Sequence, residues 1–253
     1  MFLQKRGCCG NTRKFYFKAL RAILNRANAE GVGSVATYPF GRGGFEVSKL
    51  EEATAKRYLP AAELSKLKSS TASNPQCEYA RKLFLFSYYC YGISFIDMAM
   101  LTTAHIKQME DGDYIVYKRQ KIKRQKGVKP ISIKITPAIR QLIGSLQAAS
   151  PTVDDFLLPI VTRSGYTGER LYMHIRTRYS KYQKYLRLLA EELGINFHLT
   201  SYVSRHTAAM TLQRNHIPRE VISQMLGHAD LETTNIYLDS FDNGVINEAA
   251  KVL

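Results

Sequence analysis

Near the C-terminus, a stretch of polar and apolar residues with helical character holds an arginine, two histidines and a tyrosine in a fixed order. Arg205 and His206 come first, Leu226-Gly227-His228 follows, and Tyr237 lies nine residues after His228. A phosphodiester needs cations and hydrogen-bond donors around its non-bridging oxygens, and a hydroxyl directed at phosphorus. This stretch supplies a candidate for each task. The alternative is an ordinary helical core that contains these residue types.

The segment from residue 197 to 241 resembles the signature region of the tyrosine recombinases, the phage-integrase family. That family carries an H-x-x-R-H box, an L-G-H box and a nucleophilic tyrosine in this order. Here they appear as Tyr202-x-x-Arg205-His206, Leu226-Gly227-His228 and Tyr237. The first position of the first box is tyrosine instead of histidine.

Two upstream segments extend this resemblance. Residues 114–135 are similar to the family's β-hairpin, whose catalytic lysine falls on Lys121. The run GISFID, which ends at Asp97, aligns with the family's G-L-R-x-x-E, so that Ser94 stands where the first catalytic arginine usually lies. Integrases of the conjugative-transposon branch show the same substitution. The resemblance covers about residue 11 to the C-terminus.

Charge independently indicates a polyanionic partner. Lysine and arginine number 36 against 21 aspartate and glutamate residues, a net charge of +15, and the pI is about 9.7. Such a basic balance is typical of proteins that bind nucleic acid. Between residues 118 and 134 every charged side chain is positive; from this run we predict DNA contacts for Lys118, Arg119, Lys123, Arg124 and Lys126. A solvated face is the alternative, although so one-sided a run repels itself unless something neutralises it.

The length of 253 residues allows one large domain or two small ones, at roughly 150 residues per domain. Apolar residues at helical spacing predict a helix over residues 12–30, which Gly31 ends. The run GRGG at 41–44 lacks the strand-then-helix setting of a phosphate loop, so we interpret it as a linker. By the resemblance, residues 1–45 are part of a helical core-binding region with its linker, and residues 46–253 form the catalytic domain.

The pattern beyond the linker predicts a mainly α fold with a small antiparallel β-sheet. Helices are expected over residues 78–90, 137–149 and 172–193, and paired strands over 114–117 and 131–135. The helix over 172–193 interleaves arginines and lysines with tyrosines. We expect the tyrosines to pack against other helices and some of the cations to meet the DNA backbone.

Local spacing explains the two boxes. Thr200 is a good N-cap, and residues three apart share a helix face, so Tyr202 and Arg205 can address one phosphate. His206 is turned about 100° away and is expected to hold a neighbouring loop. Gly227 suits the left-handed position that ends the next helix.

The chemistry that the resemblance implies needs neither a cofactor nor a metal ion. Tyr237, on a last short helix over 231–238, attacks phosphorus, forms a 3′-phosphotyrosyl link and releases a 5′-hydroxyl. Arg205 and His228 stabilise the non-bridging oxygens. Lys121 protonates the leaving oxygen, and Tyr202 donates a hydrogen bond.

A serine at position 94 cannot replace the charge or the fork geometry of a guanidinium. Either another cation compensates, with Arg81, Lys82 and Arg119 nearest in sequence, or the protein is a catalytically weakened or inactive DNA-binding protein that acts as a regulator. A nuclease in which Tyr237 is structural is a third alternative. A metal nuclease needs clustered carboxylates, and the acidic residues here are scattered.

The expected partners are double-stranded DNA attachment sites of a mobile element. The resemblance implies four protomers on two DNA sites, with the segment after Tyr237 docking onto a neighbour, and leaves open an accessory DNA-bending protein. No stretch reaches the roughly 18 consecutive apolar residues of a membrane span, so no membrane is expected. Four cysteines without zinc spacing are typical of reduced thiols, and we predict a cytoplasmic protein encoded by a bacterium, phage or mobile element.

Overall fold

The computed structural model describes residues 2–41, 43–52, 57–228, 234 and 238. The chain divides into two compact units, residues 1–55 and 56–253. Tyr237, the rest of the helix expected around it apart from residues 234 and 238, and the segment after it lie outside the described residues. The assignment of the N-terminal residues to a core-binding region stays a prediction.

The first unit is built around one long helix. It contains α1 (Phe2–Lys5), α2 (Gly10–Ala29) and the 3₁₀ turns η1 (Val35–Thr37) and η2 (Val47–Leu50). The helix predicted over residues 12–30 is therefore confirmed. The ring of Phe17 on α2 meets those of Phe40 and Phe45, with centroids 6.3 and 4.6 Å away. These contacts fold the glycine-rich segment back onto α2.

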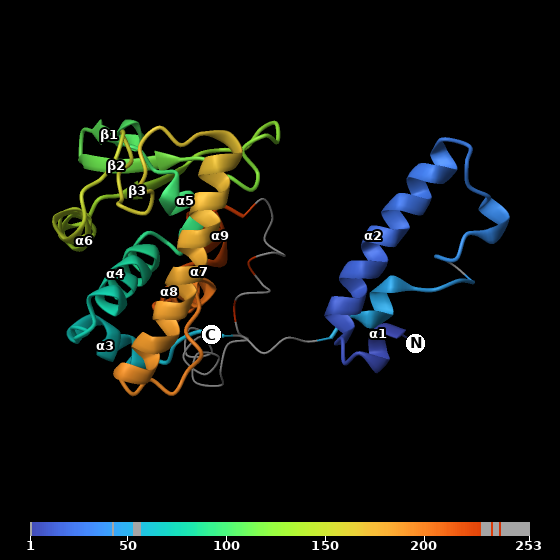
Figure 1. Ribbon diagram of the computed structural model, residues 1–253, viewed down its shortest axis with the longest axis horizontal. Helices are drawn as coiled ribbons and strands as arrows, with labels where there is room; N and C mark the ends of the chain where they lie inside the picture. Colours follow the sequence, from blue (N-terminus) through green and yellow to red (C-terminus); the bar gives the residue numbers. More distant parts are fainter. Residues whose placement is uncertain (1, 42, 53–56, 229–233, 235–237, 239–253) are drawn as a thin grey trace, which may run out of the picture. The chain divides into compact units, whose positions relative to one another are not determined.

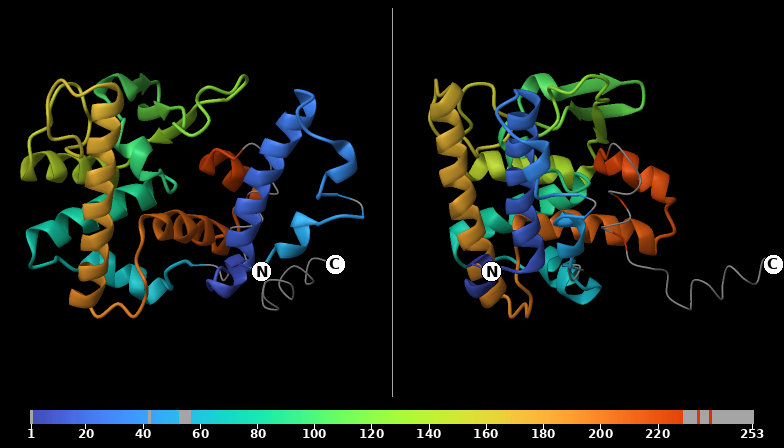
Figure 2. Two further views of the ribbon diagram at one scale, coloured as in Figure 1. Left: turned by 45° about the vertical axis from the view of Figure 1, so that its right-hand side comes forward. Right: turned by 90° about the vertical axis from the view of Figure 1, so that its right-hand side faces the viewer.

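The second unit is mostly helical, with one small sheet, as the sequence predicts. Its elements are α3 (Ala61–Ser69), α4 (Pro75–Tyr89), α5 (Phe95–Ala99), η3 (Thr103–His105), β1 (Ile106–Met109), β2 (Gly112–Tyr117), β3 (Ile131–Lys134), α6 (Pro137–Ala149), α7 (Gly168–Glu192), α8 (Ser201–Arg214) and α9 (Arg219–Leu226). In Figure 1 the strands lie at one end of this unit and α3 at the other. Figure 2 shows α7 running along the unit between these two levels.

The sheet is antiparallel, in the order β1-β2-β3. Ile115 of β2 pairs with Ile133 of β3, and both side chains are fully buried. The predicted strands β2 and β3 are thus confirmed. β1 was not predicted, because its Lys107 and Gln108 are exposed and its short sequence lacks an alternating apolar pattern.

Helix α4 forms the centre of the core. The side-chain oxygen of Asn74 accepts hydrogen bonds from the backbone N–H groups of Gln76 and Cys77, which caps the helix before Pro75 in its first turn. Leu83, Phe84 and Phe86 are completely buried. Burial of each such side chain contributes roughly 1.5–3 kcal/mol. Because α4 packs against α6, α7 and α8, it anchors the two helices that carry most of the site described below.

A smaller core cluster holds α9 against α8. It contains Met210 of α8 and Ile222 and Leu226 of α9. Gly227 ends α9 in the left-handed conformation with φ of 64°, which confirms the prediction for this glycine. None of the helices in the described ranges is both long and apolar enough to cross a membrane.

Candidate functional site

Arg205 is the point where three segments converge. The residue is only 3% exposed. Its Nη1 donates to the carbonyl of Gly92 at 3.1 Å, and its Nη2 donates to the carbonyl of Leu226 and to Nε2 of His228, the latter at 2.9 Å. Gly92 has φ of 72°, and a Cβ there would lie 2.4 Å from the Cα of Arg205. We call Gly92, Arg205, Leu226, Gly227 and His228 the fixed site.

His228 follows the left-handed Gly227 directly. Since a guanidinium cannot accept a hydrogen bond, Nε2 of His228 is the acceptor from Arg205. Its Nδ1 lies 2.8 Å from the hydroxyl of buried Thr234, so the ring proton belongs on Nδ1. The ring as placed supports Arg205, whereas the sequence predicted a donor to phosphate oxygens.

Ser94 caps α5 instead of pointing freely at a ligand. Its hydroxyl donates to Oδ2 of Asp97 at 2.6 Å and accepts from the backbone N–H of Asp97 at 3.3 Å. The other carboxylate oxygen of buried Asp97 accepts from the backbone N–H of Gln120 at 2.7 Å. Asp97 therefore fixes the chain between Arg119 and Lys121, and Ser94 holds Asp97.

A cavity of about 390 Å³ opens beside these residues. Its lining includes Ser94 and two groups of side chains, the arginines Arg119, Arg176 and Arg205 and the tyrosines Tyr172, Tyr179 and Tyr202. No carboxylate is among its lining residues in the described part of the chain. The cavity thus brings together four residues that the sequence singled out: Ser94, Arg119, Tyr202 and Arg205.

The start of α8 is bound to α7. The backbone N–H of Ser201 donates to Oε1 of Gln183 at 2.8 Å, and Nε2 of Gln183 donates to the hydroxyl of Tyr179 at 3.0 Å. This network fixes the residue just before Tyr202, which is 49% exposed at the cavity. The ring of His206 packs edge-on against that of Tyr202, with centroids 5.2 Å apart.

The connection between β2 and β3, residues 118–130, carries most of the predicted DNA contacts. We call it the basic connection. Its Lys118, Lys121, Lys123, Arg124 and Lys126 are all exposed, and none forms an ion pair with a carboxylate within the described ranges. Lys121 does not line the 390 Å³ cavity. A second cavity, of about 730 Å³, lies between the basic connection and α9, and His228 is among its lining residues.

Arg119 links the basic connection to the 390 Å³ cavity. It is half-buried at the root of the basic connection, and its Nη1 donates to the carbonyl of Gly227 at 3.3 Å. The same residue forms part of the wall of the 390 Å³ cavity.

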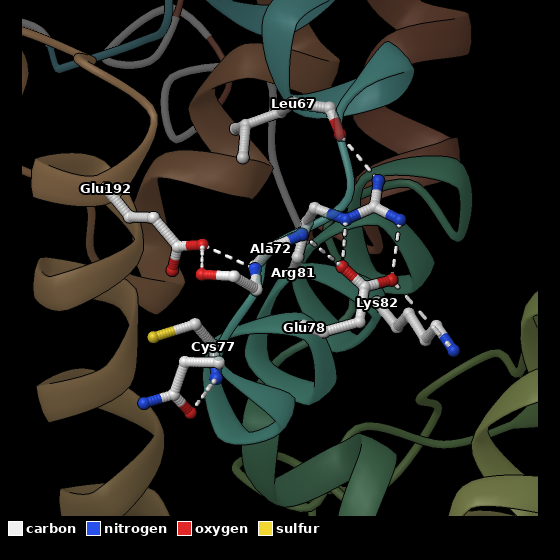
Figure 3. Close-up of polar contacts among 9 residues, drawn as sticks. Leu67, Ala72, Cys77, Glu78, Arg81, Lys82 and Glu192 are labelled. Atoms are coloured by element: carbon white, nitrogen blue, oxygen red, sulfur yellow. Dashed lines mark hydrogen bonds and ion pairs between the residues drawn. The ribbon is translucent and has the colours of Figure 1, made fainter.

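The other two cations considered as replacements for the missing arginine are engaged elsewhere (Figure 3). The guanidinium of Arg81 donates hydrogen bonds to both carboxylate oxygens of Glu78, each at 2.7 Å, and another to the carbonyl of Leu67. Lys82 lies 3.9 Å from the same carboxylate. Burial alone would raise the pKa of Glu78, but the hydrogen bonds from Arg81 and from the backbone of Ala72 lower it. This cluster ties α4 to α3, and neither cation lines the cavity.

Sequence reasoning did not single out Arg176, Tyr172 and Tyr179 for the site. The only available signal was the mixture of cations and tyrosines along α7, which does not say which of them face a cavity. Within the described residues, no group of three histidine, cysteine or acidic side chains lies close enough to hold a metal ion.

Comparisons with known proteins identify the family and the fold. The family model described as the phage integrase family matches residues 57–243. Among solved structures, the chain resembles XerA recombinase with 21% identity and a TM-score of 0.54, covering 80% of this chain and 67% of that one. XerH recombinase in a post-cleavage complex with palindromic difH substrate gives 19% identity and a TM-score of 0.65, over 98% and 69% of the two chains.

The Tn1549 transposon integrase in complex with transposon right end DNA gives 14% identity and a TM-score of 0.65, over 98% of this chain and 81% of that one. The chain spans 64% of the XerH chain in its pre-cleavage complex. No curated protein sequence matches the chain.

Proposed function

Because the chain belongs to the phage integrase family, the tyrosine-type enzymes that cleave and rejoin DNA, we propose that it recombines specific DNA sites through a 3′-phosphotyrosyl intermediate on Tyr237. The observation that carries the proposal is the fixed site. The buried guanidinium of Arg205 is held by two carbonyls and an imidazole and lines the 390 Å³ cavity. Two more arginines line this cavity, and no carboxylate of the described residues does so. Such a preorganised cation suits the pentacoordinate transition state of phosphoryl transfer.

In the proposed reaction the Tyr237 oxygen forms a bond to the scissile phosphorus, and the bond from phosphorus to the 5′-oxygen breaks. The tyrosine hydroxyl gives its proton to water, and Lys121 gives a proton to the leaving 5′-oxygen. Rejoining runs the same steps backwards with the 5′-hydroxyl of another strand as the nucleophile. Arg205 holds the non-bridging oxygens, and Tyr202 donates a hydrogen bond from the same cavity.

The remaining site residues, His228, Ser94 and Arg119, position the reacting groups or add positive charge. His228 keeps Arg205 in place as a hydrogen-bond acceptor, and its predicted donation to the phosphate requires the proton to move to Nε2. Ser94 acts through Asp97 on the chain that joins Arg119 to Lys121. Of the three cations considered for the missing charge, Arg119 is the one in the cavity lining.

The proposal extends to the setting of the reaction. The substrates are double-stranded attachment sites of a mobile element, which the protein integrates or excises. Four protomers act on two such sites, with or without an accessory DNA-bending protein, in the cytoplasm. The charge of +15 supports a DNA partner.

Trapping on a nicked suicide substrate of the native attachment site tests the proposal. The nicked strand loses a short fragment after cleavage, so that the protein remains covalently attached and migrates with DNA on a denaturing gel. Tyr237→Phe removes only the nucleophilic oxygen, and it should bind DNA normally while forming no adduct. Tyr16→Phe, which changes an exposed tyrosine of the first unit, is the matched control and should form the adduct at the normal yield.

An undiminished adduct from Tyr237→Phe would place the nucleophile elsewhere. No adduct from the unchanged protein on its cognate site would favour the alternative, a DNA-binding regulator without catalysis.

A further inference from the structure

In the described part of the chain, three guanidiniums and no carboxylate line the 390 Å³ cavity. Arg205 comes from α8, Arg119 from the root of the basic connection and Arg176 from α7. Like charges around one cavity repel each other, and an anion inside it relieves that repulsion. Three separate elements therefore contribute charge to one anion-binding space.

Arg176 differs from the other two arginines in its bonding. Arg205 is committed to two carbonyls and an imidazole, and Arg119 to the carbonyl of Gly227. Within the described part of the chain, no carbonyl or carboxylate accepts from the guanidinium of Arg176, which is on an exposed residue. All five of its N–H groups are thus available to a ligand.

Position 94 explains why a cation from α7 can be used here. Ser94, with its short side chain, and Gly92, with none, line the cavity, and the Ser94 hydroxyl donates to Asp97. A long side chain at position 94 would fill part of the cavity. With serine there, this space stays open, and Arg176 lines the same cavity. Tyr172 and Tyr179, about one turn before and after Arg176 on the same helix face, line that wall with it.

We propose that Arg176 binds the scissile phosphate from α7 and supplies the second guanidinium that Ser94 cannot supply. This inference rests on the recombinase function proposed above. The planar fork of Arg176 binds one non-bridging oxygen pair bidentately, while Arg205 approaches from the α8 side.

The test compares Arg176→Ala with Arg187→Ala. Arg187 is the same residue type on the same helix, eleven residues further, which corresponds to nearly the same face about 16 Å away. It is exposed and does not line the cavity. Both variants lose one exposed charge, and thermal unfolding followed by circular dichroism should show both to be folded.

Cleavage is measured on the suicide substrate at saturating DNA, once with the ordinary scissile phosphate and once with a methylphosphonate there. Arg176→Ala should cleave the phosphate about 10²–10³ times more slowly than the unchanged protein. The methylphosphonate lacks the negative charge that Arg176 neutralises, so on that substrate the difference should fall below tenfold. Arg187→Ala should cleave both substrates at near-normal rates, and Arg176→Lys should recover only part of the loss, because lysine lacks the fork.

Two results would overturn the inference. The first is a cleavage rate of Arg176→Ala on the phosphate substrate within threefold of the unchanged protein. The second is a loss of cleavage rate in Arg176→Ala that is equally large on the phosphate and on the methylphosphonate. Arg119→Ala is assayed in parallel. If methylphosphonate restores the cleavage rate of Arg119→Ala but not that of Arg176→Ala, Arg119 is the compensating cation and the inference is also overturned. A failure of the unchanged protein to form any adduct would instead refute the proposed function.

Discussion

The fixed site and the basic connection both carry positive charge, but they hold it in opposite ways. Arg205 is buried, and its guanidinium is bonded to three groups from two other segments. Lys123, Arg124 and Lys126 are exposed and have no carboxylate partners in the described ranges. A buried, oriented charge acts strongly on one atom, whereas an exposed charge is screened by salt and acts on many phosphates equally.

This contrast assigns different tasks to the two regions. Changes in the fixed site should alter the rate of cleavage, and changes in the basic connection should alter the affinity for DNA. Arg119 and Lys121 lie at the join between them, where the Asp97 carboxylate holds the intervening backbone N–H. The predictions below test whether the division is as sharp as the geometry indicates.

The largest effect is expected from Gly92→Ala. The added Cβ would lie 2.4 Å from the Cα of Arg205, and φ at this position is 72°. Overpacking and the left-handed conformation together should cost about 2–5 kcal/mol of folding free energy. Displacement of Arg205 should also slow cleavage at least ~10³-fold. Thermal unfolding and suicide-substrate trapping measure the two losses.

Gly127→Ala is the matched control for that variant. Gly127 lies in the basic connection with φ of 77°, and a Cβ there meets nothing within 4 Å. It carries the same conformational penalty, about 1–2 kcal/mol, without the clash. Its cleavage rate should stay within threefold of normal; an equal loss in both variants would show that the close approach at Gly92 is unimportant.

Lys121→Ala should slow cleavage by about 10² while DNA affinity changes little. The physical reason is the loss of the proton that the leaving 5′-oxygen needs. A 5′-phosphorothiolate at the scissile bond has a sulfur that leaves without a proton, so it should restore the rate of this variant selectively. Lack of rescue would remove Lys121 from the general-acid role and make it one more exposed cation of the basic connection.

Replacing Lys123, Arg124 and Lys126 by alanine should weaken binding to all DNA sequences alike. The log–log dependence of affinity on salt should flatten by up to about 0.9 for each phosphate that the variant no longer neutralises. Once DNA is saturating, the variant should cleave at a near-normal rate. Exchanging the three residues for the other cation, Lys123→Arg, Arg124→Lys and Lys126→Arg, provides a control that keeps the charge. A slow catalytic step in the alanine variant alone would contradict the division of tasks.

Ser94→Ala should have the smallest effect on cleavage, less than tenfold. The variant loses the cap on α5 and the hydrogen bond to Asp97, which should cost about 0.5–2 kcal/mol of stability. Ser94→Thr keeps the hydroxyl and should recover most of that stability. A loss above a hundredfold in a folded Ser94→Ala protein would mean that the hydroxyl touches the phosphate.

The sequence was most informative where one residue type has few conformational or spatial options. Gly227 could be predicted as a left-handed helix end, and the helix over residues 137–149 has the predicted bounds, because proline and glycine restrict where a helix can start and stop. The spacing within the first box also predicted that Tyr202 and Arg205 can address one phosphate, since residues three apart share a helix face, and both line the 390 Å³ cavity.

The prediction of the compensating cation was weaker, because candidates were chosen by their distance from Ser94 along the chain and not by their distance in space. Arg81 and Lys82 are near Ser94 in sequence, yet their side chains turn to Glu78, three and four residues away on the same helix. That pairing could have been expected from the spacing alone. Arg176 is more than 80 residues from Ser94, and only the packing of α7 against α5 brings it to the cavity.

The cap on α5 also bears on how this site can change over evolutionary time. A change from Ser94 to arginine needs one substitution, but it would remove the hydroxyl that Asp97 binds and add a fourth guanidinium to a cavity that three already line. Both consequences make arginine less favourable here unless position 97 or one of the other arginines changes first. A change of this serine to arginine is therefore expected only after one of those other changes.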